Sequence, residues 1–297
     1  MAAALNAPAP DAPRVPAIGP DGTLNNIVLE NPQAASVTPN VLASAARGLP
    51  MVRWGAHEGR DAVIVGTGPS LERRENWRAI KRAAERGAVV YALKGAATLL
   101  RGHGIPVHYV ASCDPVTDEI DKMPIVPGAT YLLASCCCPG LYDKILGAGC
   151  PVEVYHSFMG AAPGPWRSES DFYAHHFGGD GWIATGGTTV ANRILDVALD
   201  RHGVRRVTMT GVDFGSRNRE AHYARGSLGA HGRGVIIVQD GGALDGRTWF
   251  TQPTLMIAAI HVAKLILVGV VEVVGDSLAV AFARRPDQMN EAVRGVM

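Results

Sequence analysis

Short apolar runs alternate with stretches of helical periodicity along most of the chain, from residue 61 onward. Continuous apolar runs of this length are typical of strands that are buried on both faces of a parallel sheet. The strand candidates are residues 62–65, 88–93, 107–112, 130–135, 152–155, 207–210 and 270–274. The helix candidates between them are residues 70–86, 96–102, 187–202 and 253–268. The alternation predicts an α/β fold, a mostly parallel sheet with helices on both faces.

The first 60 residues follow a different pattern. Alanine and proline dominate as far as Pro20, no lysine precedes Lys81, and no period of 2 or 3.6 residues is present. We therefore predict two regions, an extended N-terminal arm at 1–60 and one α/β domain at 61–297. Such an arm is ordered when it packs on its own domain or on a neighbouring subunit, so a homo-oligomer held by the arm is one expectation.

Composition and charge narrow the class of protein. Hydrophobic residues make up 47% of the 297 residues and charged residues 19%, which excludes a disordered chain. The formal net charge of +1 provides no field to attract a polyanion, so we expect no generic nucleic-acid binding.

The cysteines and the most apolar stretch of the chain indicate the cellular compartment. The five cysteines include the adjacent residues 136–138, which supports neither a disulfide framework nor a zinc site and indicates a reducing, cytoplasmic setting. The most apolar stretch, residues 255–275, is interrupted by His261, Lys264 and Glu272, so no membrane span is expected.

The strongest local signal is a glycine-rich turn, Gly66, Thr67, Gly68 and then Pro69 and Ser70, directly after the first predicted strand. Glycines let the backbone approach a ligand, and the free N–H groups of the following helix, with Ser70 as N-cap, favour an anion. The pattern is neither G-x-G-x-x-G nor Walker A, which disfavours a redox dinucleotide and a P-loop NTPase. We predict a phosphate-bearing ligand here; the alternative is a tight turn without one.

A second glycine-rich turn, Thr185, Gly186, Gly187 and Thr188, stands at the start of a predicted helix. Its N–H and hydroxyl groups are donors suited to phosphate or ribose. Two such turns in one sheet predict a nucleotide that lies across both. Taken alone, the second turn is equally well explained as a helix cap.

Charged and polar residues that follow the strands are further candidates. Asp114 and Asp213 each come after a predicted strand, where ligands of open α/β sheets bind, so they are placed to hold a ribose hydroxyl or Mg²⁺. The alternative is that both carboxylates cap loops. His222 and Tyr223 lie in a glycine-rich stretch, where His222 is a candidate general base and an ordinary surface histidine is the alternative.

Four motifs in this order resemble the superfamily of archaeal 6-hydroxymethyl-dihydropterin diphosphokinase-like proteins, whose members are also widespread in phage genomes. The motifs are the two glycine turns, Gly-Val-Asp-Phe at 211–214 and Val-Gly-Asp-Ser-Leu at 274–278. The likeness spans residues 61–282 and leaves the arm uncovered. It implies a Rossmann-like sheet that binds a nucleotide at both glycine turns.

The resemblance also implies a reaction, the transfer of a diphosphate from ATP to a pterin-like or other hydroxymethyl acceptor. Asp114 and Asp213 would then orient magnesium and the phosphates. The sequence departs from the family at this point, because an Asp-rich motif is replaced by Ser-Cys-Asp-Pro at 112–115, with Asp118 and Asp121 farther along.

Two other functions remain open. The motif order also resembles bacterial sialyltransferases that use a CMP-activated sugar, with Thr67 in place of their Asn and His222 and Tyr223 matching their catalytic pair. That likeness implies glycosyl transfer from a nucleotide-sugar to a glycan or other acceptor, with His222 as base. The third hypothesis is a non-catalytic phage structural or assembly protein on the same fold, located in the host cytoplasm or the virion.

Overall fold

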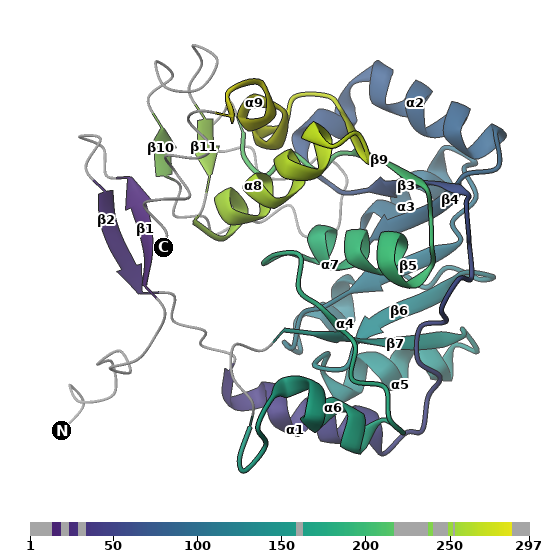
Figure 1. Ribbon diagram of the computed structural model, residues 1–297. Helices are drawn as coiled ribbons and strands as arrows, with labels where there is room; N and C mark the ends of the chain where they lie inside the picture. The colour runs from purple at the N-terminus through teal and green to yellow at the C-terminus, as the bar shows by residue number, and fades with distance from the viewer. Residues whose placement is uncertain are drawn as a thin grey trace.

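The protein is described by a computed structural model that covers residues 14–18, 24–28, 34–158, 163–216, 237–239, 249–251 and 253–286. Its centre is a sheet of eight parallel strands in the order β12-β9-β3-β4-β5-β6-β7-β8 (Figure 1). The strands are β3 (Asp61–Val65), β4 (Val89–Leu93), β5 (Tyr109–Ser112), β6 (Thr130–Ala134), β7 (Val152–Ser157), β8 (Ile183–Ala184), β9 (Arg206–Thr210) and β12 (Val271–Val274). This architecture confirms the predicted Rossmann-like α/β class.

The strand order explains where a site can form. The chain steps across the sheet from β3 to β8 and then returns, so that β9 pairs with β3 on the side opposite β4. The strand order therefore reverses between β3 and β9. In open α/β sheets, the connections at such a reversal diverge and leave a crevice at the carboxyl ends of the strands.

All the strands predicted from apolar runs are present, with bounds that differ by two residues at most. The strands in the middle of the sheet are almost entirely buried, whereas β12 at its edge exposes Glu272. Every residue of β4 is buried, which is why this run carries no polar alternation. The sequence missed β8, because a strand of two residues gives no pattern.

Helices connect the strands on both faces. They are α2 (Arg74–Glu85), α3 (Ala96–Gly102), α4 (Glu119–Lys122), α5 (Pro139–Gly147), α6 (Glu169–His176), α7 (Val190–Asp196), α8 (Pro253–Leu267) and α9 (Leu278–Arg284). Right-handed crossovers that step in opposite directions place their helices on opposite faces, so α2, α3 and α5 lie opposite α7 and α8. Helix α7 contacts β3, β4, β5 and α8. No helix among the described residues is long and apolar enough to cross a membrane.

Two predicted helices begin later than expected. Residues 70–86 form a 3₁₀ helix, η1 (Pro69–Glu72), and then α2, because the extended backbone of Arg73 (φ −79°, ψ 137°) separates them. Ser70 is not the N-cap; that position is Gly68 for η1 and Arg73 for α2. The helix expected at 187–202 begins at Val190 and ends in a π-helix, η2 (Val197–Arg201).

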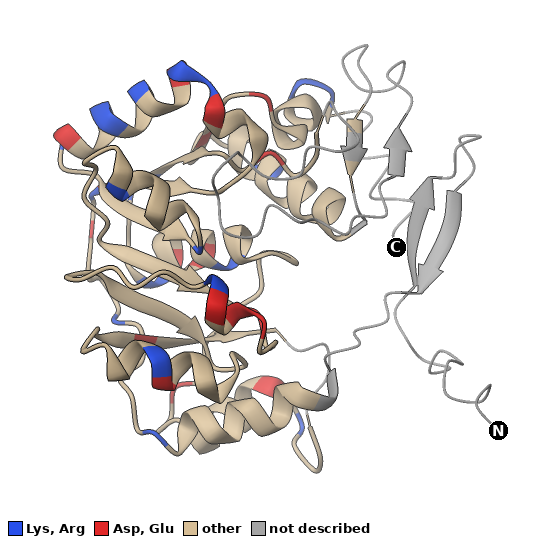
Figure 2. Ribbon diagram, turned by 180° about the vertical axis from the view of Figure 1, so that it is seen from behind, with Lys and Arg blue, Asp and Glu red and all other residues tan. Residues whose placement is uncertain are grey.

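The charged residues follow this layering. Figure 2 shows Lys, Arg, Asp and Glu at many positions of α2 and at few positions of the strands. Helix α2 buries Asn76, Ile80 and Ala83 at helical spacing and exposes its charged side chains. This face is an ordinary solvated helix surface.

Within the segment predicted to be an arm, residues from 34 onward pack on the α/β domain. Helix α1 (Ala34–Ala45) packs on the domain, and Val37 and Val41 are buried. Val52 is also buried, and its backbone N–H donates to the carbonyl oxygen of Val154 in β7 at 2.9 Å. Residues 34–60 are therefore part of the domain, since burying these side chains and pairing this backbone lower the free energy of the fold.

Two short antiparallel pairs complete the described chain. Strand β1 (Arg14–Ile18) pairs with β2 (Leu24–Val28), and β10 (Ile237–Gln239) pairs with β11 (Trp249–Thr251). Strand β1 contacts β10 and α8. The N-terminal segment thus touches its own domain, while the oligomer expected from it stays a prediction.

Candidate functional site

The glycine turn after β3 packs directly on the end of β9. The N–H of Gly68 donates to the carbonyl oxygen of Gly211 at 2.7 Å, and a Cβ on Gly68 would lie 2.7 Å from Asp213 Oδ2. Gly211 has a positive φ of 62°, a conformation that favours glycine. These glycines are therefore required by the contact between two chain segments, and Thr67 is left half-buried in the turn.

Ser70 and Asp213 form the tightest polar contact of this turn. The backbone N–H of Ser70 donates to Asp213 Oδ2 at 2.7 Å, and its hydroxyl donates to Asp213 Oδ1. The position at the helix start where we expected a ligand anion is thus occupied by a carboxylate of the chain. Burial raises the pKa of Asp213 to about 7, although the two hydrogen bonds from Ser70 act in the opposite direction.

The C-terminal motif belongs to the same arrangement. A Cβ on Gly275, whose φ is 104°, would lie 3.1 Å from Ser70 Cβ, so only glycine fits here without strain. The hydroxyl of Ser277 donates to the carbonyl oxygen of Val212 at 3.0 Å. Three of the four sequence motifs therefore meet at the carboxyl ends of β3, β9 and β12.

The second glycine turn is built in a similar way around a carboxylate. The N–H of Gly186 donates to Asp196 Oδ2 at 2.5 Å, and Gly186 is buried. Burial raises the pKa of Asp196 to about 6. Thr188 is exposed, and its hydroxyl donates to the carbonyl oxygen of Thr254 at the start of α8 at 2.5 Å.

The helix after this turn is capped by Thr189, not by a ligand. Its hydroxyl accepts the N–H of Asn192 at 3.4 Å. Among the donors predicted to reach a nucleotide, the Gly186 N–H and the Thr188 hydroxyl are therefore already used. Thr185 and Thr188 are exposed, and Gly187 is half-buried. Their role as ligand donors stays a prediction.

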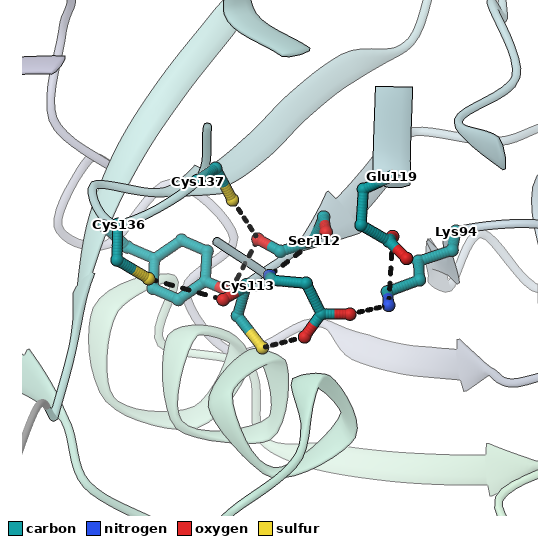
Figure 3. Close-up of polar contacts among 8 residues, drawn as sticks. Lys94, Ser112, Cys113, Glu119, Cys136 and Cys137 are labelled. Atoms are coloured by element: carbon teal, nitrogen blue, oxygen red, sulfur yellow. Dashed lines mark hydrogen bonds and ion pairs between the residues drawn. The ribbon is translucent and has the colours of Figure 1, made fainter. Parts of the chain in front are cut away.

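An ion-pair cluster lies at the ends of β4 and β5 (Figure 3). Lys94 Nζ pairs with Asp114 Oδ2, and it lies 3.0 Å from Oε2 of Glu119, which is buried. Burial alone would lower the pKa of Lys94, but the carboxylates of Asp114 and Glu119 raise it well above its ordinary value. Lys94 has a positive φ of 50°, which is uncommon for a non-glycine residue and marks a strained position.

Cysteine thiols beside this cluster donate hydrogen bonds to the backbone that carries Asp114. They are not nucleophiles. The Cys136 thiol donates to the carbonyl oxygen of Cys113 at 3.3 Å, and the Cys137 thiol donates to that of Ser112 at 3.5 Å. Burial raises the pKa of the Cys113, Cys136 and Cys137 thiols, so these thiols are protonated at neutral pH. The adjacent residues Cys136, Cys137 and Cys138 are all buried and lie in the turn after β6.

Asp114, the predicted magnesium ligand, is already paired within the chain. Its carboxylate is engaged by Lys94, and within the described ranges no three or more His, Cys, Asp or Glu residues are grouped to hold a metal ion. Asp118 and Asp121 do not join Asp114 in such a group. Magnesium is commonly held by one or two carboxylates together with substrate phosphates, so the role of Asp114 in holding Mg²⁺ stays a prediction.

Sequence reasoning found part of this edge and missed part of it. Asp114 and Asp213 lie at strand ends as predicted, whereas His222 and Tyr223 lie outside the described residues. Lys94, Glu119 and Asp196 were missed. Lys94 gave the same signal as Asp114, a charged residue directly after a buried strand, while the other two lie in helices and gave none.

The parallel sheet, its reversal of strand order and the turns packed there define a Rossmann-like α/β protein with a transferase-like fold. The sequence matches the family described as "6-hydroxymethylpterin diphosphokinase MptE-like" over residues 49–219, more than half of the chain. The chain belongs to this family. The match begins inside the predicted arm, in agreement with the packing of Val52 on β7.

The fold is also similar to that of a larger solved protein, "MAf glycosyltransferase from Magnetospirillum magneticum AMB-1". The TM-score is 0.52 at 16% sequence identity, and the similarity covers 89% of this chain and 41% of that one. The chain thus spans about two-fifths of that protein's length, and the likeness concerns the fold alone. A comparison of the sequence with curated proteins gives no match.

Proposed function

We propose that this protein is a nucleotide-dependent transferase that moves a diphosphoryl group from ATP to a pterin-like or other hydroxymethyl acceptor. The membership in the 6-hydroxymethylpterin diphosphokinase family supports the reaction class. The observation that carries the proposal is the convergence of the β3, β9 and β12 turns at the strand-order reversal, where open α/β sheets bind their ligands.

In this reaction the acceptor hydroxyl oxygen forms a bond to the β-phosphorus of ATP. The bond between that phosphorus and the oxygen of the α-phosphate breaks, and AMP leaves. Catalysis of phosphoryl transfer depends on positioning and on neutralising charge. Lys94, at the end of the strand next to β3, is the positive charge that we assign to the phosphates, held in place by Asp114 and Glu119.

Ser70 and Asp213 act as positioning residues in this proposal. Their hydrogen bonds fix the turn that carries Thr67 and Gly68, so the turn presents one surface to a ligand. The acceptor proton would go to a general base, for which His222 and its neighbour Tyr223 are the candidates from the sequence. The donors proposed for the other end of the nucleotide are the Thr185 hydroxyl and the backbone N–H groups of Gly187 and Thr188.

A second candidate function is glycosyl transfer from a nucleotide-sugar. The likeness in fold to a glycosyltransferase favours it. In that reaction His222 would remove the proton of the acceptor hydroxyl, and a nucleotide would leave the sugar.

Binding and product assays separate these functions. The purified chain is titrated with ATP, GTP, CTP and CMP-sugars, and Thr67→Val is compared with Thr98→Val, an exposed threonine on α3. We expect ATP to bind and Thr67→Val alone to weaken it. Release of AMP when ATP and a hydroxymethylpterin are present supports diphosphoryl transfer, while release of CMP or UDP from a nucleotide-sugar supports the second candidate. Absence of binding to every nucleotide would overturn both and leave the non-catalytic assembly protein.

A further inference from the structure

A surface hollow of about 200 Å³ lies beside the end of β12, at the motif Val-Gly-Asp-Ser-Leu. Its lining includes Arg73, which precedes α2, Asp276 and Ser277, which follow β12, and Arg284 from α9. The proposed function uses this motif only for its packing on the β3 and β9 turns and assigns no role to either arginine. The hollow therefore calls for its own explanation.

Two guanidinium groups dominate the charge of the hollow. Arg73 is half exposed, with Nη2 3.6 Å from Asp276 Oδ2 and Nη1 4.0 Å from Glu75 Oε1, and Arg284 is exposed. Glu75 does not line the hollow, so its lining carries two positive charges and one negative charge. Guanidinium groups bind phosphate through paired N–H donors, which a lysine cannot match.

The place and the size of the hollow restrict what it holds. Gly275 lines the hollow and also packs closely on Ser70, so the hollow lies next to the Ser70–Asp213 contact. Sites for whole ligands measure roughly 300–1,000 Å³. At about 200 Å³, this one accommodates the charged end of a molecule and not a complete nucleotide.

We propose that the hollow is an anion-binding subsite in which Arg73 and Arg284 hold a phosphate or diphosphate group. Only the identity of the molecule that carries this group rests on the proposed function: it is the phosphate tail of the nucleotide or an anionic group of the acceptor. Asp276 competes with the anion for the guanidinium of Arg73 and so limits the affinity.

The test is calorimetric titration of inorganic diphosphate into the full chain at low salt with EDTA present. We expect Arg73→Gln and Arg284→Gln each to weaken binding by about tenfold or more, because each removes one of two charge-assisted contacts. Arg74→Gln is the matched control, since Arg74 is exposed on the same helix and does not line the hollow. Asp276→Asn has the opposite expected sign and should tighten binding.

The subsite is disproved if the unmodified chain does not bind diphosphate, if Arg74→Gln weakens binding as much as Arg73→Gln, or if Asp276→Asn weakens it. Thermal unfolding checks that each variant is folded. Arg73 and Arg284 lie on different elements, so if Arg73→Gln does not fold, the diphosphate affinity of Arg284→Gln still tests the subsite.

A second set of titrations identifies the source of the phosphate. If the hollow holds the nucleotide tail, ATP displaces diphosphate and Arg284→Gln weakens ATP more than AMP. If it holds an acceptor group, ATP and diphosphate bind together. Binding of diphosphate without binding of any nucleotide would refute the proposed function and leave the subsite standing.

Discussion

Ser70 and Asp213 are separated by 143 positions in the chain and are joined by two hydrogen bonds, from the backbone N–H and the hydroxyl of Ser70 to the two oxygens of one carboxylate. They connect the turn after β3 to the end of β9, the two strands between which the strand order reverses. The first glycine turn therefore contains its own anion. A ligand at this edge binds beside the Asp213 carboxylate and not in its place.

The protonation of Asp213 leads to a pH prediction. Its pKa is about 7 in the fold because of burial, against about 4 in an unfolded chain. An acid whose pKa is raised by folding adds stability below the unfolded value, and this contribution is lost as the pH rises through the folded value. Asp213→Asn removes the titration; its amide oxygen still accepts the Ser70 N–H, and its NH₂ group donates to the Ser70 hydroxyl. The unmodified chain should therefore lose about 1.4 kcal/mol of unfolding free energy per pH unit between pH 5 and 7 relative to Asp213→Asn.

Denaturant unfolding at pH 5, 6, 7 and 8 measures this difference. Burial also raises the pKa of Asp196, to about 6, and lowers that of His202 to about 3. Both groups are present in each variant, so the difference isolates Asp213. Asp121→Asn, at an exposed position, should behave like the unmodified chain. Parallel pH profiles for Asp213→Asn and the unmodified chain would show that the carboxyl group does not titrate in this range.

Gly68 should be intolerant of any side chain, with or without a ligand. A Cβ would lie 2.7 Å from Asp213 Oδ2 and 2.8 Å from the carbonyl oxygen of Gly211. Gly68→Ala should lower the unfolding free energy by about 1–3 kcal/mol, the usual cost of overpacking. Gly102→Ala, in a helix with open space around the new methyl group, should be neutral or stabilising. Equal unfolding midpoints for the two variants would contradict the contact between the turns.

Lys94 should be needed for stability as well as for the proposed chemistry. Lys94→Met leaves the buried carboxylate of Glu119 without its ion-pair partner. We expect a loss of about 2 kcal/mol, because partial exposure of Lys94 and Asp114 reduces the penalty of an unpaired charge. Adding Glu119→Gln should restore part of it.

The control for this pair of substitutions is Lys81→Met, an exposed position on α2. Thermal unfolding of the single and double variants gives the coupling between Lys94 and Glu119. If the double variant is no more stable than Lys94→Met alone, the ion pair does not contribute as stated.

Two truncations test the N-terminal segment. Removing residues 1–33 should leave the domain folded, whereas removing residues 1–60 should lower its melting temperature or abolish folding, because α1 and the pairing of Val52 with β7 are lost. Light scattering on the full chain and on the shorter truncation then measures whether residues 1–33 hold subunits together. A domain that is equally stable without residues 34–60 would restore the original prediction of an arm.

Local sequence patterns are enough to predict the class of fold and most strands of the sheet. Strands buried on both faces need continuous apolar runs, so a short stretch of sequence is enough to locate them. Helix α3 likewise begins and ends at the predicted residues 96 and 102. The residues that directly follow these apolar runs also predicted that the glycine turns, Asp114 and Asp213 lie at strand ends. The sequence missed helix α1, because two of the four positions on its buried stripe are polar: Asn40 donates to the carbonyl oxygen of Cys136, and Ser44 donates to the hydroxyl of Tyr142.

Which residues meet at the site depends on how the strands are arranged in the folded chain. No local sequence pattern predicts the order of the strands. Asp213 meets Ser70 because β9 returns to pair with β3. The same holds for Lys94 and Glu119, which meet because β4 and β5 are neighbours and α4 follows β5. Carboxylates that the sequence offered to a ligand or a metal ion instead satisfy N–H groups and a lysine of the chain, because a buried charge or donor is stable only when it is paired.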